Sequence, residues 1–388
     1  MRIHLNLRTI ENAFAISLAT LAITYGVLRQ AETVVAAAPR QSDAAPANIV
    51  NANLQTRAVT GSLVDTLRTL QAQANNATWL GYSVPQISGD RTMCCGNYTD
   101  GGDYRCGTCR LEHDGDSYTT KNNDKSTSGG TVHLEGPRQL LVLFRLADKQ
   151  VTKIRLASED CTLDAGGLPF LWLTGVKPAD SVAVLSDFAR NSALEGRSEH
   201  EITQGALSAI ALHDDPSADR AFASFIASDQ PEALRKHASF WLGAARGKAG
   251  IPLLQKMAHS DPSTEVRSQV AFALSVSHQP EALPEMIRMA KEDESTHVRG
   301  QALFWLAHKA GDKAVSAIQG AIENDPDTDV KKKAVFALSQ LPKDEGVPKL
   351  IEVAKTNHNR EVRKQAMFWL GQSNDPRALA FFEQILSQ

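Results

Sequence analysis

One short pattern returns at a constant interval through the C-terminal half of the chain, without a gap. Each copy begins with Leu or Val and a basic residue, and Phe, then Trp or Ala, then Leu follow six to eight positions later. The five copies start at Leu234, Val266, Val298, Val330 and Val362, so the period is 32. A period of this length predicts a solenoid, in which each repeat buries its apolar face against its neighbours.

A second helical pattern accompanies each copy. Ile251, Leu254 and Ala258 have the i, i+3, i+7 spacing of one helix face, and the same spacing recurs in the later copies. Asp261-Pro262, or an equivalent Asp or Asn, stands between the two patterns, where it suits the end of one helix and the cap of the next. We therefore predict that each repeat is a pair of antiparallel helices joined by tight turns.

An acidic residue precedes each second helix, and a basic residue follows it six positions later. The pairs are Asp229/Arg235, Asp261/Arg267, Asp293/Arg299 and Asp325/Lys331. With these pairs the region resembles the HEAT and HEAT-like family of α-solenoids, in the short variety typified by repeats related to bilin lyases. The resemblance implies a ladder that links neighbouring repeats, and hence a structural role in place of a nucleic-acid or anion site. Because Lys331 lacks the two-point geometry of Arg and Asn357 replaces the acid, the ladder is expected to weaken towards the C-terminus.

A longer period, twice the first, is superimposed on it. Trp241, Trp305 and Trp369 alternate with Ala273 and Ala337 at the same place in the repeat. The first helices that follow alternate between a polar residue and Ile in the same rhythm. We interpret the alternation as volume compensation in a close-packed core. An aromatic cage for a ligand is the alternative.

Residues 1–38 have the features of a Sec-type signal peptide. Basic residues lie within residues 1–8, an apolar run spans residues 13–28, and the small residues 35–38 offer a cleavage site. The apolar run is short for a membrane-spanning helix, so we predict export to the periplasm or the cell exterior. An uncleaved anchor is the alternative, and only then would the protein be held at a membrane. Residues 39–59 are rich in Ala, Asn, Gln and Pro and are predicted to be a linker.

Residues 60–190 predict a small α+β domain. Leu63, Leu67 and Leu70 mark an amphipathic helix, and residues 178–190 mark a closing helix. Strand patterns lie between them, at residues 78–84, 131–134, 139–146, 151–157 and 168–173, and they suggest antiparallel strands with a β-meander. The predicted fold is therefore an α-solenoid of HEAT-like helical hairpins in residues 191–388, preceded by this small domain.

Four cysteines, Cys94, Cys95, Cys106 and Cys109, cluster within the small domain. In an exported protein oxidation is the default, and nested disulfides Cys94–Cys109 and Cys95–Cys106 fit a segment that folds back on itself. A zinc site made of the four thiolates is an alternative, although Cys94 and Cys95 are adjacent and lack the usual ligand spacing. Cys106 and Cys109 also have the spacing of a redox motif, but a strand-like sequence follows them instead of a helix N-terminus.

No catalytic family is evident in residues 60–190. His113, His133, Cys161 and Asp164 would have to meet to form a hydrolase or metal site, and no motif places them together. No Gly-rich phosphate loop is present, and no cofactor is predicted.

Charge and architecture together favour a protein or peptide partner. A net charge of −3 and a pI near 6.4 argue against binding to a nucleic-acid backbone. The second helices of stacked hairpins usually line the concave side, and the positions about 170–300° round from each starting Leu or Val should face outwards there. These positions are Lys236, Ser268, Gly300, Lys332 and Lys364, flanked by His237, Gln269, Gln301, Lys333 and Gln365.

This surface is polar at both ends and uncharged in the middle. We expect it to bind the partner, through Lys236 and His237 at one end and through Lys332, Lys333 and Lys364 at the other. The predicted function is a non-enzymatic interaction scaffold or adaptor among exported proteins. The alternative is a metal-binding or hydrolytic enzyme with its site in residues 60–190 and the solenoid as a recruiting arm.

Overall fold

The structure is a computed structural model, and Asp43–Gln388 form one compact unit in it. It describes residues 44–46, 48–88, 91–94, 97–100, 108–113, 138–191, 197–309 and 311–387. The predicted signal peptide, residues 1–38, lies outside the described residues, as does the predicted strand at residues 131–134. Within the described part of the chain, no helix has the length and apolar character needed to cross a membrane.

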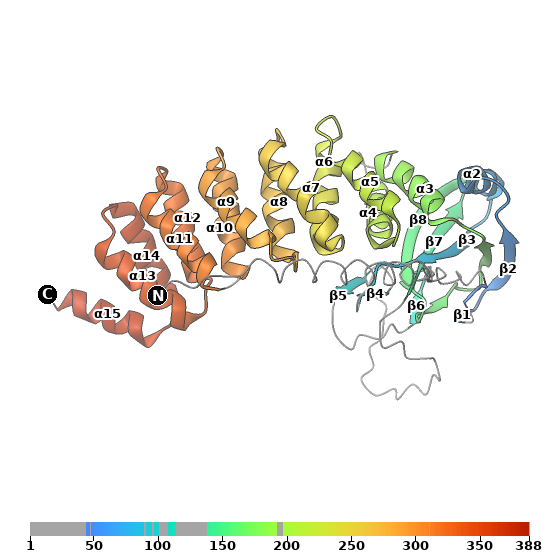
Figure 1. Cartoon of the computed structure of the whole chain (residues 1–388). Coiled ribbons are helices and arrows are strands. Elements are labelled where there is room, and N and C mark those ends of the chain that lie inside the picture. The colour runs from blue at the N-terminus through green and yellow to red at the C-terminus, as the bar shows by residue number, and fades with distance from the viewer. Residues whose placement is uncertain are drawn as a thin grey trace, which may run out of the picture. The chain divides into compact units, whose positions relative to one another are not determined.

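The N-terminal part contains mixed β-sheets flanked by helices, as Figure 1 shows at its blue and green end. A five-stranded sheet has the order β2-β10-β3-β7-β8, a three-stranded sheet the order β1-β9-β6, and β4 pairs with β5. The strands are β1 (Ile49–Val50), β2 (Asn53–Ala58), β3 (Thr78–Pro85), β4 (Arg91–Cys94), β5 (Asn97–Asp100), β6 (Thr108–Arg110), β7 (Gln139–Ala147), β8 (Gln150–Ser158), β9 (Thr162–Asp164) and β10 (Pro169–Thr174).

The predicted linker is wrong for the stretch that forms β1 and β2. Strand β2 pairs in parallel with β10 from Asn53 to Ala58, and all six of its side chains are exposed. Because backbone hydrogen bonds hold this edge strand, it needs no apolar side chains, and a composition-based argument misses it.

The hairpin of β7 and β8 confirms the antiparallel part of the prediction. Asp148 and Lys149 form its two-residue turn with φ angles of 52° and 59°, the left-handed conformation that favours such hairpins. Strand β10 departs from a simple meander because it enters between β2 and β3 and pairs in parallel with both.

The helices lie where the repeat pattern predicts them. The N-terminal part has α2 (Leu63–Gln73) and α3 (Pro178–Asn191), which confirm the two predicted helices there. The second helices of the repeats are α4 (Arg197–Leu212), α6 (Glu232–Ala244), α8 (Thr264–Val276), α10 (Thr296–Lys309), α12 (Thr328–Ser339) and α14 (Arg360–Gln372). The first helices are α5 (Pro216–Phe225), α7 (Gly247–Ser260), α9 (Ala282–Glu292), α11 (Asp312–Asn324), α13 (Lys343–Thr356) and α15 (Pro376–Leu386).

The acid between the two helices of a repeat ends the first helix and holds the turn that leads to the second. Asp261 ends α7, and its side chain accepts a hydrogen bond from the backbone N–H of Ser263 at 2.9 Å. Ser263 in turn caps α8 by accepting from the N–H of Val266. Asp293 and Asp325 repeat the first bond with Ser295 and Asp327, which fixes the tight turn in each copy.

A ladder of buried ion pairs joins consecutive repeats. The Nε and Nη2 atoms of Arg235 donate to both carboxylate oxygens of Asp261, and Arg267–Asp293 and Arg299–Asp325 repeat this geometry. Each Arg thus reaches the acid of the next repeat. For Arg267 and Arg299 the acid six positions behind offers only its backbone carbonyl.

The sheets and the solenoid share one apolar core. Helix α4 packs on β8, and Gly205 permits the close approach, because a Cβ there would lie 2.8 Å from the carbonyl oxygen of Ile154. A buried hydrogen-bond chain crosses the same junction. The Tyr82 hydroxyl lies 2.7 Å from Ser181 Oγ, and His213 Nε2 lies 2.8 Å from the same Oγ. The two predicted domains are therefore one packed body at their boundary.

Candidate functional site

The exposed side of the second helices is the candidate site. Helices α6, α8, α10, α12 and α14 contact one another more extensively than the first helices do, so they line the inner side of the stack. Figure 1 shows these helix pairs in a row that ends on the sheets. We call this surface the second-helix face, and it consists of the ten predicted partner positions together with the rings described below.

The structure places the predicted partner residues at two separate ends of this face. Lys236 and His237 lie on α6, whereas Lys332 and Lys333 lie on α12 and Lys364 on α14. Four of the five are half-buried, and Lys364 is exposed. The five residues therefore do not form one cluster, in agreement with a surface that is polar at its ends.

Most of these cations already have a local partner. Lys332 Nζ lies 2.8 Å from Asp329 Oδ1, and Lys364 Nζ lies 2.9 Å from Glu361 Oε1. The Asp329 carboxylate raises the pKa of Lys332, and Lys364 lowers the pKa of Glu361. Exposed pairs of this kind contribute little to stability, but they reduce the net charge that the face presents.

At the other end of the face Lys236 and His237 also have local partners. Lys236 Nζ lies 3.4 Å from Glu232 Oε1, and His237 Nδ1 lies 2.7 Å from the side-chain nitrogen of Gln204. Lys333 differs from the other lysines. Its aliphatic stem covers Gly300 of the preceding repeat, where a Cβ would lie 2.2 Å from Lys333 Cδ. Gly300 thus makes room for the lysine that crosses between two repeats.

A continuous chain of aromatic rings runs along the second-helix face. Phe240 stacks on Phe272 with ring centroids 5.9 Å apart and planes at 16°, and Phe304 stacks on Phe336 at 5.9 Å and 10°. Trp305 links these two stacks, because its ring lies 4.6 Å from Phe272 and 4.9 Å from Phe304. The whole chain, here called the aromatic stripe, is Trp241, Phe240, Phe272, Trp305, Phe304, Phe336, Trp369 and Phe368.

The Phe residues pack against neighbouring repeats, but their rings stay accessible. Phe240, Phe272, Phe304 and Phe336 are half-buried, and Phe368 at the end of the stripe is 54% exposed. At about 100° per residue, Phe240 lies about 240° round from Leu234, between Lys236 at about 200° and His237 at about 300°. The helical wheel therefore places the Phe rings in the middle of the predicted face, a consequence that the repeat pattern alone did not bring out.

The Trp residues occupy less enclosed positions than volume compensation predicts. Trp241 is buried, whereas Trp305 and Trp369 are half-buried, and Trp305 contacts the rings of the stripe. The carbonyl oxygen of the Gln319 side chain accepts a hydrogen bond from Lys349 Nζ at 3.2 Å.

The cysteines differ from the predicted pair of nested disulfides and from the predicted four-thiolate zinc site. Cys109 and Cys161 are each disulfide-bonded, and the described residues include no free cysteine. Because the chain has five cysteines, a bonded Cys161 takes its partner from the other four, so the bridges Cys94–Cys109 and Cys95–Cys106 cannot both form. The pairing itself depends on Cys94, Cys95 and Cys106, whose side chains lie outside the described residues.

The disulfide bonds of Cys109 and Cys161 argue against the predicted metal and hydrolase alternatives. A disulfide sulfur is not a thiolate, so Cys109 is unsuited to the four-thiolate zinc site and Cys161 to a nucleophilic role. The Asp164 carboxylate accepts hydrogen bonds from Asn51 and from the backbone of Gly166, and His133 lies outside the described residues. Where the structure describes the chain, no three His, Cys, Asp or Glu side chains are grouped to hold a metal ion.

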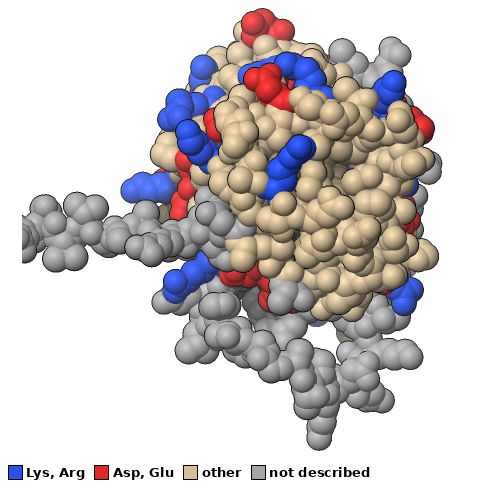
Figure 2. All heavy atoms as spheres, turned by 90° about the vertical axis from the view of Figure 1, so that its right-hand side faces the viewer, with Lys and Arg blue, Asp and Glu red and all other residues tan. Residues whose placement is uncertain are grey.

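Among the residues that the structure describes, the end of the molecule that carries the sheets offers no comparable patterned surface. Figure 2 views this end, and most of it is uncharged, with basic and acidic side chains interspersed towards its rim. Val50 and Leu54 of the outer strands are 41% and 40% exposed. Isolated exposed apolar residues are common on proteins and indicate no site by themselves.

Stacked helical hairpins, a repeated ion-pair ladder and an inner face of second helices define an α-solenoid. Residues 219–307, 283–368 and 315–388 match the HEAT repeat family. The C-terminal half of the chain is therefore a HEAT-repeat region, as the acid and Arg pairs implied.

Several solved structures show weaker similarity. Human deoxyhypusine hydroxylase in complex with glycerol is 16% identical over 53% of this chain and 90% of its own, with a TM-score of 0.25. The complex of CpcE and CpcF of phycocyanin lyase from Nostoc sp. PCC7120 is 21% identical over 40% of this chain and 99% of its own, with a TM-score of 0.30. A designed armadillo repeat protein in complex with the peptide (KR)4 is 20% identical over 50% of this chain and 91% of its own, with a TM-score of 0.28. A search of curated protein sequences found no match.

Proposed function

We propose that the protein is a non-enzymatic scaffold that binds an extended segment of another protein along its second-helix face. The observation that carries the proposal is the aromatic stripe, in which half-exposed rings from five consecutive repeats form one unbroken apolar track. HEAT-type solenoids generally use such concave surfaces for protein binding.

The chemistry of the face indicates the kind of segment that fits. Aromatic rings supply large contact areas at low cost in side-chain entropy, and polar side chains beside them supply hydrogen bonds. Gln269 and Gln301 flank the middle of the stripe, where no Lys or Arg stands at the two partner positions of each helix. The partner segment is therefore polar or acidic, with apolar side chains at intervals that match the rings.

Charge favours an acidic residue near the α12 end of the face. Lys332 and Lys364 are partly neutralised by Asp329 and Glu361, while Lys333 adds a positive charge over Gly300. A carboxylate of the partner near Lys333 would add an electrostatic contribution to the association rate, which salt would screen.

We also propose that the protein acts outside the cytoplasm. The predicted signal peptide in residues 1–38 motivates this part of the proposal, and the disulfide bonds of Cys109 and Cys161 support it, because such bonds persist in oxidising compartments. Fractionation of cells that express the full chain tests it, together with the mass of the mature N-terminus. Full-length protein in the cytoplasmic fraction would contradict export and leave the binding proposal intact.

Site-specific photo-crosslinking tests the binding proposal. A photoreactive residue at Gln301 or Gln365 lies on the second-helix face, and one at Lys256, which is exposed on the first helix α7, is the matched control. We expect the same partner to be captured from both face positions and not from position 256, and Phe304→Ala to reduce the capture. Capture of the same species from all three positions would contradict the proposal.

A further inference from the structure

Lys309 and Arg246 each donate hydrogen bonds to two backbone carbonyls at the C-terminal end of a second helix. The two helices, α8 and α4, lie two repeats apart. Lys309 Nζ donates to the backbone carbonyl of Ser275 at 3.0 Å and also to that of Ser277. Arg246 Nη1 donates to the carbonyls of Ala211 and His213 at 3.1 and 2.8 Å. The two carbonyl pairs, at positions 211 and 213 and at positions 275 and 277, are separated in sequence by one long period, which is two repeats.

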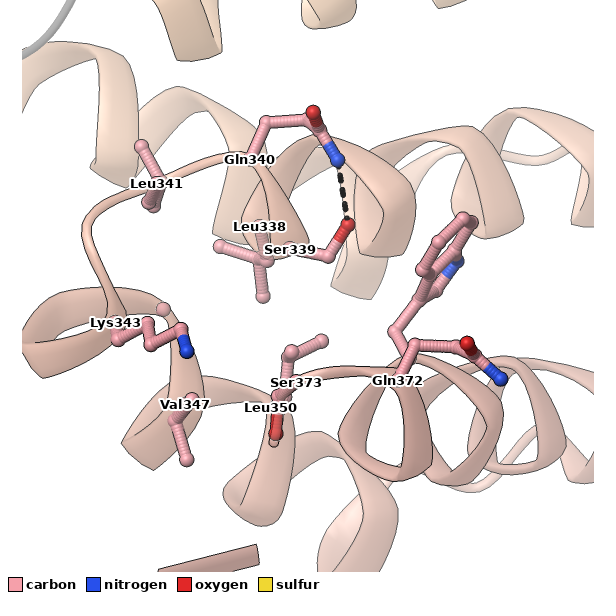
Figure 3. A pocket seen from close by; sticks show the side chains of 11 residues that line it. Leu338, Ser339, Gln340, Leu341, Lys343, Val347, Leu350, Gln372 and Ser373 are labelled. Atoms are coloured by element: carbon pink, nitrogen blue, oxygen red, sulfur yellow. Dashed lines mark hydrogen bonds between the residues drawn. The ribbon is translucent and has the colours of Figure 1, made fainter. Parts of the chain in front are cut away.

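One long period further along the chain, at the end of α12, the equivalent carbonyls have no such cation of a described residue bound to them. Residues 339 and 341 are the equivalents, and neither the carbonyl of Ser339 nor that of Leu341 accepts a hydrogen bond from a described residue. Ser373 replaces Lys309, and its hydroxyl donates to the carbonyl of Leu370 in its own helix. A cavity of about 180 Å³ occupies this place, where the C-terminal ends of α12 and α14 meet the start of α13 (Figure 3).

The surroundings of the cavity favour a positive group over water alone. The C-terminal end of α12 carries the negative end of its helix dipole, which favours a cation there, and Trp369 is among the residues that line the cavity. The volume exceeds that of a single water molecule several times, which leaves room for the last methylenes of an alkyl chain. Two repeats earlier, partial burial lowers the pKa of Lys309 by desolvation, yet its ammonium group still bonds to both carbonyls.

One charged group opposes such a ligand. The side chain of Lys343 also lines the cavity, and Figure 3 shows its amino group turned towards the space near Ser373. Its equivalents in the two earlier long periods are Gln279 and Asp215, neither of which is cationic. Lys343 is exposed, so it can turn into solvent when the cavity is occupied.

We propose that this cavity binds a primary ammonium group, and that a lysine side chain of a partner protein supplies it. The ammonium group takes the place that Lys309 fills two repeats earlier, and it donates to the carbonyls of Ser339 and Leu341. This site is separate from the second-helix face, because it lies at the turn end of the helices and shares only Trp369 with the aromatic stripe.

NMR titration of the full chain with a capped lysine, Nα-acetyl-lysine methylamide, tests the site. We expect saturable shifts of the backbone amide signals of Leu341 and Ser373 at millimolar concentration, and no such shifts with the uncharged capped norleucine. Lys343→Gln should tighten the binding roughly fivefold, because a like charge a few ångströms away is removed. Equal shifts with norleucine, or no shifts with lysine, would overturn the proposal.

Ser373→Lys supplies the missing cation within the chain and is the key variant. It should abolish the response to capped lysine and raise the Tm, whereas Ser373→Ala should leave the response unchanged. Continued binding by the folded Ser373→Lys protein would overturn the proposal. Titration with n-butylammonium separates the two sources of the ligand: binding of both probes supports a side-chain source, and binding of butylammonium alone would contradict it.

Discussion

Arg267 and Asp293 form a buried two-point ion pair across two neighbouring repeats, with donor–acceptor distances of 2.9 and 3.1 Å. The Asp293 carboxylate also accepts from the backbone N–H of Ser295, so the acid holds its own turn and the preceding repeat at once. Hydrogen bonds to Asp293 raise the pKa of Arg267, so its guanidinium stays charged.

Removing one member of this pair should be strongly destabilising. Arg267→Met leaves the Asp293 carboxylate buried without its counter-ion, and we expect a loss of about 3–5 kcal/mol in the free energy of unfolding. Chemical denaturation measures it. Asp293→Asn in the same chain should recover part of the loss. Lys364→Met, which breaks the exposed pair with Glu361, should have a far smaller effect.

A missing rung of the ladder can be built. Lys331 and Asn357 occupy the places that an Arg and an Asp hold in the three ion pairs, but Lys331 Nζ donates to the carbonyl of Glu323 instead. A cavity of about 470 Å³ lies there, lined by both residues. We expect Lys331→Arg with Asn357→Asp to be more stable than the sum of the single variants by about 1–3 kcal/mol. A double-mutant cycle with no coupling would contradict this account of the ladder.

The aromatic stripe should contribute to stability in proportion to the burial of each ring. Phe272→Ala and Phe304→Ala remove half-buried rings with stacked neighbours, and we expect each to cost about 2 kcal/mol, below the roughly 3–5 kcal/mol of a fully buried Phe. Phe368→Ala, at the 54% exposed end of the stripe, should change the free energy of unfolding by no more than about 0.5 kcal/mol. Thermal and urea unfolding of the three variants compare them directly. Equal effects would show that burial does not set the contribution of each ring to stability.

The junction between the sheets and the solenoid should weaken in mild acid. Burial lowers the pKa of His213 from its ordinary 6.5 to about 4, with Arg246 acting in the same direction and the carbonyl of Ala209 and Asp215 opposing it. Below pH 6.5 the unfolded chain therefore binds a proton at His213 that the folded chain does not bind. The stabilisation is complete above pH 6.5 and is lost as the pH falls towards 4, by about 3 kcal/mol in total.

Urea unfolding at several pH values from neutral to mildly acidic measures this loss. His213→Gln should remove most of the pH dependence attributed to the buried imidazole, although it also lowers stability at neutral pH. The matched variant His358→Gln, at a position between α13 and α14, controls for the loss of one histidine. Identical slopes in all three proteins would exclude His213 as the cause.

The solenoid could be predicted from the sequence because its determinants are local and repeated. Leu234, Val266 and their equivalents recur at a fixed period and are buried, and the acid and Arg pairs form inter-repeat contacts. What the six-residue spacing did not show is the partner of each Arg. The side-chain contact reaches the next repeat, and the pairing at the shorter spacing is only to a backbone carbonyl.

The N-terminal part was less predictable because its order comes from distant backbone pairing. Strand β2 has no apolar pattern, and its place depends on β10, which follows much later in the chain. The aromatic stripe could not be predicted for a related reason: the repeat pattern gives the position of each Phe, and only the stacked helices show that Trp305 joins two Phe stacks into one surface.

The association kinetics of the crosslinked partner test the central claim most directly. Lys332→Glu, Lys333→Glu and Lys364→Glu together reverse the charge at one end of the second-helix face. Lys256→Glu, Lys291→Glu and Lys313→Glu make the same change in net charge on exposed positions of the first helices. We expect the first triple variant to remain folded, to associate with the partner about tenfold more slowly at low salt, and to lose the salt dependence of the rate, while the control triple stays close to wild type. An unchanged association rate in the first variant, or equal slowing in both, would contradict binding at this face.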